Sequence, residues 1–437
     1  MMSKEIKGFS KLSKKEKINW LVSSYFKDDS HAENILKQYW NSNESLQNLH
    51  DEFSENSISN YYLPFSIAPN FLINDKKFTI PMTIEESSVV AAAGKAAKFW
   101  MKHGGFKSEV INDEKIGQVH FFYHGNKKTI IEYFDFIKPI LFKETESITK
   151  KMKSRGGGIT DISLIDKSSQ LAGYFQLFAT FKTVDAMGAN FINSCLEEFA
   201  NIFKNSTQLY ESEKLKKEEI EVVMSILSNY VPNCLVKTEV SCSVEDINSL
   251  EPNTPDFAHK MIQAINIANL DIHRAVTHNK GIMNGIDAVV IATGNDFRAI
   301  EAGAHAYASR NGTYQSLSNA YIKNNNFYFE LTLPLAIGTV GGVTNLHPLV
   351  KLALKILGNP NSKELMKIIA SVGLAQNFGA LRSLVTSGIQ KGHMKMHLIN
   401  LLNKYELKQE EKKIAIAYFK NRTVSSSSVD SFIRNLR

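Results

Sequence analysis

The spacing of apolar and polar positions divides the chain of 437 residues into segments of different character. Residues 1–75 are polar and helix-prone, with breaks near their two prolines. Residues 83–105 carry an alanine-rich run that follows the carboxylates Glu85 and Glu86 and ends at two glycines. Because acidic side chains stabilise the start of a helix and glycine often ends one, this segment is predicted to be a capped helix.

Residues 113–227 have a different pattern, in which β-branched and aromatic residues are frequent. The pattern predicts elements in the order β-α-β-β-α, which is typical of a split βαβ, ferredoxin-like domain. The sequence therefore predicts an α+β fold, in which this compact domain is inserted between two parts of a more helical one. The expected elements are at 118–123, 129–142, 160–165, 171–181 and 188–203, with a candidate last strand at 235–242.

The helical domain is expected to consist of residues 1–112 and 228–388. Its second part is predicted to contain one strand, at 327–333, which runs into a loop with three glycines. Residues 389–437 are charged and less apolar, which indicates a separate small C-terminal element. The helices of the second part are expected at 255–275, 296–309, 347–358 and 364–385.

The composition is that of a globular protein, because 43% of the residues are hydrophobic and 22% are charged. The 51 basic and 44 acidic residues give a net charge of +7, and six lysines fall within the first seventeen positions. A short basic arm is more often solvated than bound to nucleic acid or a membrane. Since no RNA-recognition pattern or zinc finger is present, no nucleic-acid partner is predicted.

The chain is predicted to be cytoplasmic and free of disulfides. Its three cysteines, Cys195, Cys234 and Cys242, have no CxxC spacing, which fits a reducing compartment. The N-terminus is charged but lacks the apolar core of a secretory signal. No apolar run reaches the roughly 18 residues that span a bilayer, so no membrane association is expected.

The glycine clusters indicate a nucleotide or phosphate ligand, although the common nucleotide-binding and hydrolase motifs are absent. Glycine allows the backbone to approach a ligand closely, which suits phosphates. Turns and helix caps use glycine as well, so only the four clusters together favour a ligand site. They lie at 155–158, 185–190, 281–285 and 338–342.

Lys280 is the most specific candidate for catalysis. It is expected in a loop, where a fixed cation could stabilise a developing oxyanion. His278 and Asn284 flank it and could form hydrogen bonds with a polar substrate. Asp296 directly precedes a predicted helix, and a role as its N-cap would alone explain this residue.

His393 and His397 are four residues apart and would share one face of a helix. Such a pair could ligate a metal, but no carboxylate or cysteine nearby completes a site, so no metal is predicted. The alternative is that His393 is a general acid on a mobile C-terminal element, because histidine titrates near neutral pH.

These motifs together resemble the 3-hydroxy-3-methylglutaryl-CoA (HMG-CoA) reductase family, class II bacterial type. The resemblance runs from about residue 80 to residue 397, and its blocks occur in the family's order. The two most specific are HNKGIMNGID and TGND. The others are TIEESSVVAAAGKAA, RGGG, DAMGAN, ILSN, HRAVTH, FRAIEAGAHAYASR and VGLAQNFGALRSLVTSGIQKGHM.

The resemblance implies a dimer or higher even oligomer with sites at the subunit interface, and a C-terminal flap over residues 389–437. It implies NADPH- or NADH-dependent reduction of HMG-CoA to mevalonate and CoA by two hydride transfers. The expected catalytic residues are Glu86, Lys280, Asp296 and His393. Lys280 would stabilise the oxyanion, Glu86 would donate a proton, Asp296 would couple these two, and His393 would protonate the CoA thiolate.

The remaining site residues are also implied by the resemblance. NADPH is expected rather than NADH, because Thr149 stands where NAD-using relatives carry an aspartate, and cations follow it. Substrate contacts are expected from Ser88, Arg274 and Asn284. Cofactor contacts are expected from Asp185, Met187, Gly188, Asn190 and Asn229, and from the cations Lys150, Lys151 and Arg155.

Two alternatives remain open at this point. The same enzyme could work in the oxidative direction, in mevalonate degradation. The chain could also be a non-catalytic CoA- or nucleotide-binding relative, although all four catalytic positions are present.

Overall fold

The computed structural model describes residues 5–27, 29–210, 215–386, 388, 398–399, 401–405, 407–419, 422 and 424–436. The chain forms two compact units, Met1–Pro64 and Phe65–Arg437. The first unit is helical, and its helices are a 3-10 turn at Phe9–Lys11, α1 (Lys14–Tyr25), α2 (Ser30–Gln38) and α3 (Glu44–Asp51). Lys14 links the ends of this unit by an ion pair to Asp51 at 2.8 Å.

The second unit opens with a β-hairpin, although helix was predicted up to residue 75. The antiparallel strands are β1 (Phe65–Ile73) and β2 (Lys76–Thr83). β1 carries Pro69 inside a register shift, which is where a strand tolerates a residue that lacks an N–H donor. The expected alanine-rich helix follows as α4 (Val89–Met101), and Gly104 and Gly105 after it have positive φ values.

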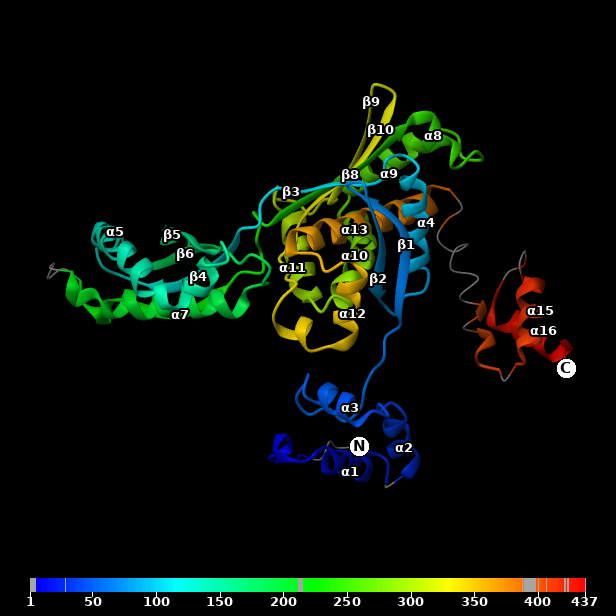
Figure 1. Cartoon of the computed structure of the whole chain (residues 1–437), viewed down its shortest axis with the longest axis horizontal. Helices are drawn as coiled ribbons and strands as arrows, with labels where there is room; N and C mark the ends of the chain where they lie inside the picture. The colour runs from blue at the N-terminus through cyan, green and yellow to red at the C-terminus, as the bar shows by residue number, and fades with distance from the viewer. Residues whose placement is uncertain are drawn as a thin grey trace. The chain divides into compact units, whose positions relative to one another are not determined.

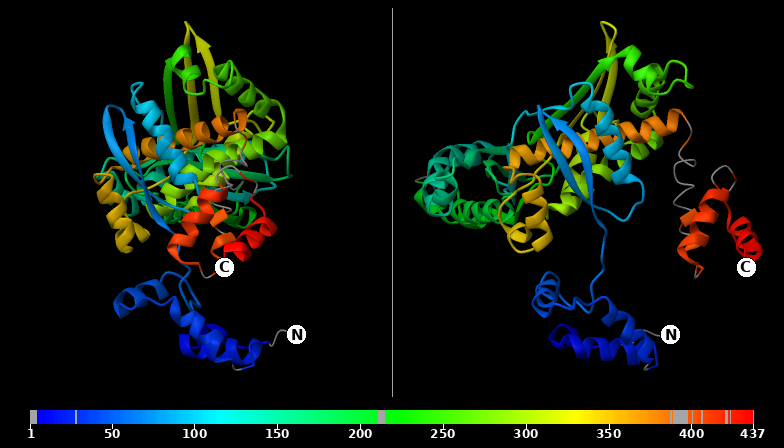
Figure 2. Two further views of the ribbon diagram at one scale, coloured as in Figure 1. Left: turned by 90° about the vertical axis from the view of Figure 1, so that its right-hand side faces the viewer. Right: turned by 45° about the vertical axis from the view of Figure 1, so that its right-hand side comes forward.

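A central antiparallel sheet has the strand order β3-β8-β10-β9. Its strands are β3 (Lys107–Val110), β8 (Leu235–Ser243), β9 (Ser318–Lys323) and β10 (Asn326–Pro334). The prediction that 235–242 closes the inserted domain is therefore wrong, because β8 pairs with β3 and β10 instead. β9 was not predicted; it is a short edge strand in a polar stretch, and Figure 2 shows it with β10 as a projecting hairpin.

The predicted ferredoxin-like arrangement is present in the order β-α-β-β-α-β. The strands β4 (Lys115–Phe122), β5 (Gly158–Asp166), β6 (Tyr174–Lys182) and β7 (Glu221–Leu227) form an antiparallel sheet in the order β5-β6-β4-β7. The helices are α5 (Lys127–Glu144), α6 (Glu146–Lys153) and α7 (Ala189–Asn205) (Figure 1). α5 and α7 bury alternate residues of the strands, Phe121 and Leu177 among them, in a core of their own.

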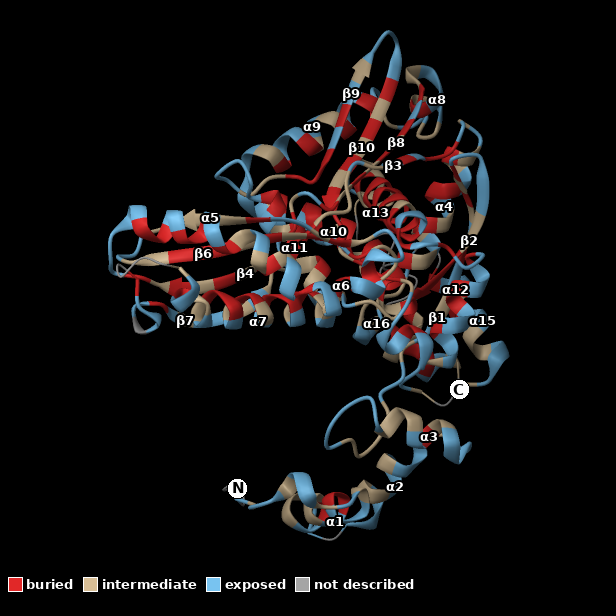
Figure 3. Cartoon of the chain, turned by 60° about the vertical axis from the view of Figure 1, so that its left-hand side comes forward, coloured by how far each residue is buried: buried red, intermediate tan, exposed pale blue. Residues whose placement is uncertain are grey.

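The large core surrounds two long helices that cross closely. They are α10 (Ile272–Ala292) and α13 (Ser362–Val385), and Figure 3 shows both as largely buried. A Cβ at Gly285 would lie 2.8 Å from the Gln376 Cβ, and one at Gly373 would lie 2.8 Å from the Ile286 side chain. The two glycines therefore set the separation of these helices. The other helices of this core are α8 (Val244–Ser249), α9 (Phe257–Leu270), α11 (Phe297–Ala308) and α12 (Pro348–Ile356).

One helix of the described residues, α13, is long and apolar enough to cross a bilayer by length and composition. However, 67% of its most apolar stretch is buried inside the structure, which its place at the centre of the core explains. The C-terminal residues form α15 (Gln409–Tyr418) and α16 (Ser426–Leu436), with a small separate core that includes Leu402, Phe419 and Val429.

Candidate functional site

Six of the candidate residues identified from the sequence line one pocket of about 270 Å³. The start of α4 and the middle of α10 form one part of its wall, and the second half of α13 forms the other. The candidate residues in it are Glu86, Ser88, Arg274, His278, Lys280 and Asn284.

Lys280 and Glu86 form an ion pair in this pocket, with Nζ 2.7 Å from Oε2, and the Asn284 amide donates to the same oxygen at 3.3 Å. The prediction of a loop around Lys280 is wrong, because Lys280 lies in the interior of α10. The helix places Lys280 and Asn284 one turn apart on one face. Since the Lys280 side chain is 60% exposed, the ion pair adds little stability, and its position in the pocket suggests a chemical role.

Ser88 enters α4 in a strained conformation. Its φ is 75°, in the left-handed region that a residue other than glycine rarely adopts. Its side chain does not cap the helix, so its hydroxyl is available to the pocket. Such strain costs on the order of 1–3 kcal/mol and is found most often at functional sites.

Arg274 contributes a cation without an acidic partner among the described residues. Its guanidinium is half-buried, and this burial lowers the pKa of Arg274. A buried arginine is usually paired with an acid. The pocket therefore has a free position for an anionic group, and a carboxylate matches the planar fork of a guanidinium.

A buried polar network fixes α10 behind Lys280. His278 is 2% exposed, and its Nε2 lies 2.7 Å from the Ser318 hydroxyl, which donates to Asn377 Oδ1 at 2.7 Å. Because the single Ser318 proton points to Asn377, Nε2 of His278 carries the proton of the ring. Burial and the neighbouring Arg274 lower the pKa of His278 to about 3.

The sequence did not reveal the contribution of α13 to the pocket. Gln376, Asn377, Ser383 and Leu384 line it from this helix. The available signal was the polar pair Gln376–Asn377 inside an otherwise apolar helix, where a polar residue needs a partner or a ligand.

One other expected catalytic residue, Asp296, is not among the described residues that line this pocket. Asp296 is the N-cap of α11, as its position predicted, and its carboxylate also pairs with Arg298 at 3.0 Å. From Lys280 to the end of α10 at Ala292 the helix rises about 18 Å, so Asp296 of the same chain lies far from Lys280. His393 and His397 lie outside the described residues, and the role of His393 stays a prediction.

The expected cofactor loop, residues 185–188, leads into α7. Gly188 is the N-cap of this helix with φ 93°, and no side chain caps the first N–H groups. The loop is held firmly from outside: the Asp185 carbonyl accepts from the Thr339 N–H at 2.8 Å, and its carboxylate accepts from the Ser362 N–H at 2.8 Å. Met187 and Asn190 flank Gly188, whereas Asn229 lies against α11 at Gly303.

The expected cations for the cofactor lie at the end of α6. Lys150 and Lys151 are exposed, and Arg155 lines a pocket of about 290 Å³ together with Asp185. Thr149 is fully buried, and its hydroxyl donates to the Thr145 carbonyl at 3.0 Å. Thr149 therefore has no exposed surface that a cofactor could contact. The expectation that a phosphate group binds here rests only on Lys150, Lys151 and Arg155.

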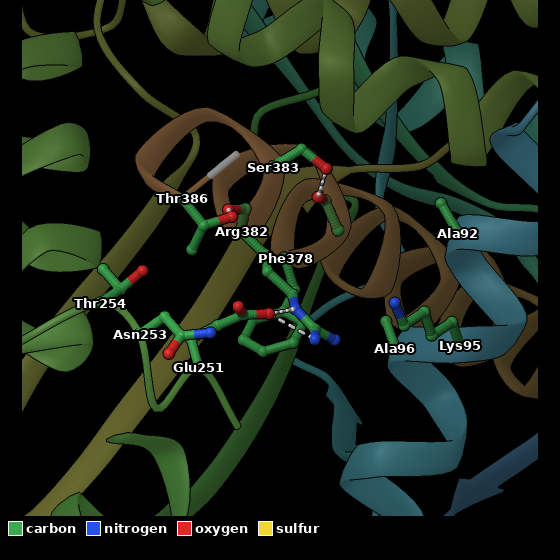
Figure 4. A pocket seen from close by; sticks show the side chains of 11 residues that line it. Ala92, Lys95, Ala96, Glu251, Asn253, Thr254, Phe378, Arg382, Ser383 and Thr386 are labelled. Atoms are coloured by element: carbon green, nitrogen blue, oxygen red, sulfur yellow. Dashed lines mark hydrogen bonds and ion pairs between the residues drawn. The ribbon is translucent and has the colours of Figure 1, made fainter. Parts of the chain in front are cut away.

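A second pocket of about 400 Å³ adjoins the first and shares Ala92, Gly379 and Ser383 with it. Figure 4 shows the Lys95 side chain pointing into it, opposite the ion pair between Arg382 and Glu251. Among the described residues Lys95 forms no ion pair. In the same described part of the chain, no group of three or more His, Cys, Asp or Glu residues could hold a metal ion.

Comparisons with known proteins show to which family the chain belongs. The family model of hydroxymethylglutaryl-coenzyme A reductase matches residues 14–398. The chain belongs to this family. It is 36% identical to the 3-hydroxy-3-methylglutaryl-coenzyme A reductase of Archaeoglobus fulgidus, over 92% of this chain and 87% of that protein. It is 34% identical to the probable reductase of Borreliella burgdorferi, over 94% of this chain and 90% of that one.

Solved structures of the reductase family give the same result. A class II 3-hydroxy-3-methylglutaryl-CoA reductase from Streptococcus pneumoniae, bound to NADPH in open conformations, is 36% identical. Its TM-score is 0.71, and the match covers 88% of this chain and all of that one. A second structure of the reductase from the same organism has a TM-score of 0.72 at 34% identity and covers 99% of this chain. The protein is therefore an oxidoreductase of the reductase family, with an α+β fold.

The buried His278 makes stability depend on pH. Its pKa of about 3 lies below the value of about 6.5 in the unfolded chain, so the unfolded state takes up the proton first as the pH falls. The free energy of unfolding should therefore fall by about 2 kcal/mol between pH 7 and pH 5 through this residue. Urea unfolding at both pH values should show this loss in the wild type and a smaller loss in His278→Gln. Equal losses in both proteins would contradict it.

Proposed function

We propose that this protein reduces 3-hydroxy-3-methylglutaryl-CoA to mevalonate and CoA with two molecules of NADPH, in the mevalonate pathway. The observation that carries the proposal is the pocket in which Lys280, Glu86 and Asn284 are joined by hydrogen bonds beside the unpaired Arg274. This arrangement offers one cation for a developing oxyanion and a second cation for a free carboxylate.

The substrate is oriented by its two ends. Arg274 binds the carboxylate of the glutaryl group, and Ser88 and Asn284 offer polar contacts within the same pocket. The thioester carbonyl then faces Lys280. The adjoining pocket, which contains Lys95, can hold the long CoA arm. The arm would pass over Ala92, whose side chain is a methyl group, and Gly379, which has no side chain.

Lys280 and Glu86 have different roles in the two reductions: Lys280 stabilises negative charge, and Glu86 donates a proton. The ammonium group of Lys280 stabilises the oxyanion that forms when the carbonyl accepts a hydride. In the ion pair Glu86 is a carboxylate that accepts from Lys280; before the aldehyde reduction it takes up a proton from solvent, which it then donates to the alkoxide. We assign to His393 the protonation of the leaving thiolate.

NADPH supplies the hydride in each step, and residues 113–227 form the domain that binds it. The residues of this domain fit a dinucleotide. The first N–H groups of α7 are uncapped, and position 188 has no room for a side chain, since a Cβ would lie 2.4 Å from the Thr183 methyl group. A helix N-terminus of this kind binds phosphate groups well.

We further propose a cytoplasmic homodimer in which Asp296 of the second subunit completes each site. Asp296 lies too far from Lys280 of its own chain, yet it is half-exposed at the start of α11. The end of α9 and the start of α10 also expose apolar side chains, with Leu270 89% and Ile272 55% exposed. An interface between two copies would cover this surface.

The function is tested by a steady-state assay of reduced nicotinamide absorbance with HMG-CoA, and by the reverse assay with mevalonate, CoA and NADP⁺. Lys280→Ala should lower kcat by about 100- to 1,000-fold, because one positioned charge at the oxyanion is lost. Lys260→Ala, an exposed lysine on α9, is the control. Activity of Lys280→Ala within tenfold of the wild type, with both proteins folded by circular dichroism, would exclude the proposed role.

The choice of NADPH is expected to depend on the cations at the end of α6. Arg155→Ala and Lys151→Ala should lower kcat/KM for NADPH by roughly tenfold while that for NADH stays unchanged, since only NADPH carries the 2′-phosphate. Lys153→Ala is a matched control on α6, because Lys153 is already paired with Glu146. A wild-type enzyme with equal or higher kcat/KM for NADH would contradict the preference.

The shared site is tested by mixing two inactive variants. Lys280→Ala and Asp296→Ala should each be inactive alone. After exchange of subunits, half of the dimers would be mixed, and one of their two sites would hold both intact residues, so about a quarter of the wild-type activity should return. No recovery, with subunit exchange shown by differently tagged chains, would place both residues in the same chain.

A further inference from the structure

Lys115 is a buried lysine at the start of β4, and sequence analysis gave it no role. Lys115 is 5% exposed, and no carboxylate of the described residues lies within ion-pair distance of its ammonium group. Its ammonium group donates three hydrogen bonds: to the Thr183 hydroxyl at 2.5 Å, the Ala186 carbonyl at 2.8 Å and the Met187 carbonyl at 2.9 Å. Three acceptors use all three protons of a charged lysine.

These three bonds hold the loop that precedes α7. The carbonyls of Ala186 and Met187 are turned toward Lys115, and in a trans peptide the N–H of the next residue points the opposite way. The N–H of Gly188 therefore points away from the lysine. It donates no hydrogen bond within the described residues.

Thr183 supports the same arrangement. Its hydroxyl accepts from Lys115 and donates to the Ala186 carbonyl at 2.7 Å, and its methyl group fills the space beside Gly188. Lys115 and Thr183 thus fix the loop from one side, while the uncapped start of α7 remains on the other. The buried charge also adds positive potential behind the helix N-terminus, which favours an anion there.

We propose that Lys115 is a positioning residue for the dinucleotide: it turns the N–H of Gly188 and the start of α7 toward the phosphate groups of NADPH. This inference rests on the proposed function, because it assumes that residues 185–190 bind the cofactor. Lys115 does not touch the cofactor in this arrangement. It acts through the two carbonyls and the threonine hydroxyl.

Burial lowers the pKa of Lys115, and the charges of Cys234 and Asp113 oppose this shift in part. If Lys115 had only a structural role, its replacement would lower the stability of the protein and would weaken the binding of both substrates equally. A positioning residue should instead affect NADPH and leave HMG-CoA unaffected, because the pocket around Lys280 is built from α4, α10 and α13.

The experiment compares the full-length wild type with Lys115→Met, which keeps the length of the side chain and removes its charge and donors. NADPH affinity is measured by fluorescence titration, and KM for HMG-CoA by the steady-state assay. Lys128→Met, on the exposed start of α5, is the matched control. Thr183→Val is the second variant, because it removes the shared hydroxyl and keeps the shape.

Lys115→Met should raise the Kd for NADPH by roughly 10- to 100-fold, with KM for HMG-CoA unchanged. Thr183→Val should act in the same direction with a smaller effect, and it decides the matter if Lys115→Met does not fold. Unchanged NADPH affinity in the variants, or equal losses for both substrates, would overturn the inference. A wild type that binds no NADPH would overturn the proposed function as well.

Discussion

The close crossing of α10 and α13 is the constraint on which the site depends. At Gly285 and Gly373 neither helix has room for a Cβ, and the axes approach until backbone and side chain touch. α10 carries Lys280 and Asn284 to one side of the pocket, and α13 carries Gln376 to the other. Because packed interiors absorb little added volume, a side chain at either glycine would separate these walls.

The sequence predicted most helices and the ferredoxin-like order, since both follow from periodicity within short windows. It misplaced Lys280 in a loop, because glycine and asparagine around it look like a turn, whereas tertiary packing overrides such propensities in a buried helix. It also assigned 235–242 to the wrong sheet. Strand pairing is a long-range choice that a local apolar pattern does not encode.

The candidate site could also be predicted only in part. The motifs located Glu86, Lys280 and Asn284, and the structure brings them together from positions almost 200 residues apart, as the 194-residue separation of Glu86 and Lys280 shows. No motif predicted that Asp296 would lie several helical turns away from Lys280, because this distance follows from the length of α10, which the motifs do not give. Nor did one predict that Thr149 would be buried.

The link between Asp185 and the first residue of α13 has a mechanical consequence. The Ser362 N–H donates to the Asp185 carboxylate at one end of this helix, and Ser383 and Leu384 line the pocket around Lys280 near its other end. A helix of 24 residues is about 36 Å long, and most of this one is packed in the core. It therefore acts as a fixed spacer between the loop that carries Asp185 and the pocket around Lys280, and neither end can shift along it without disturbing the core.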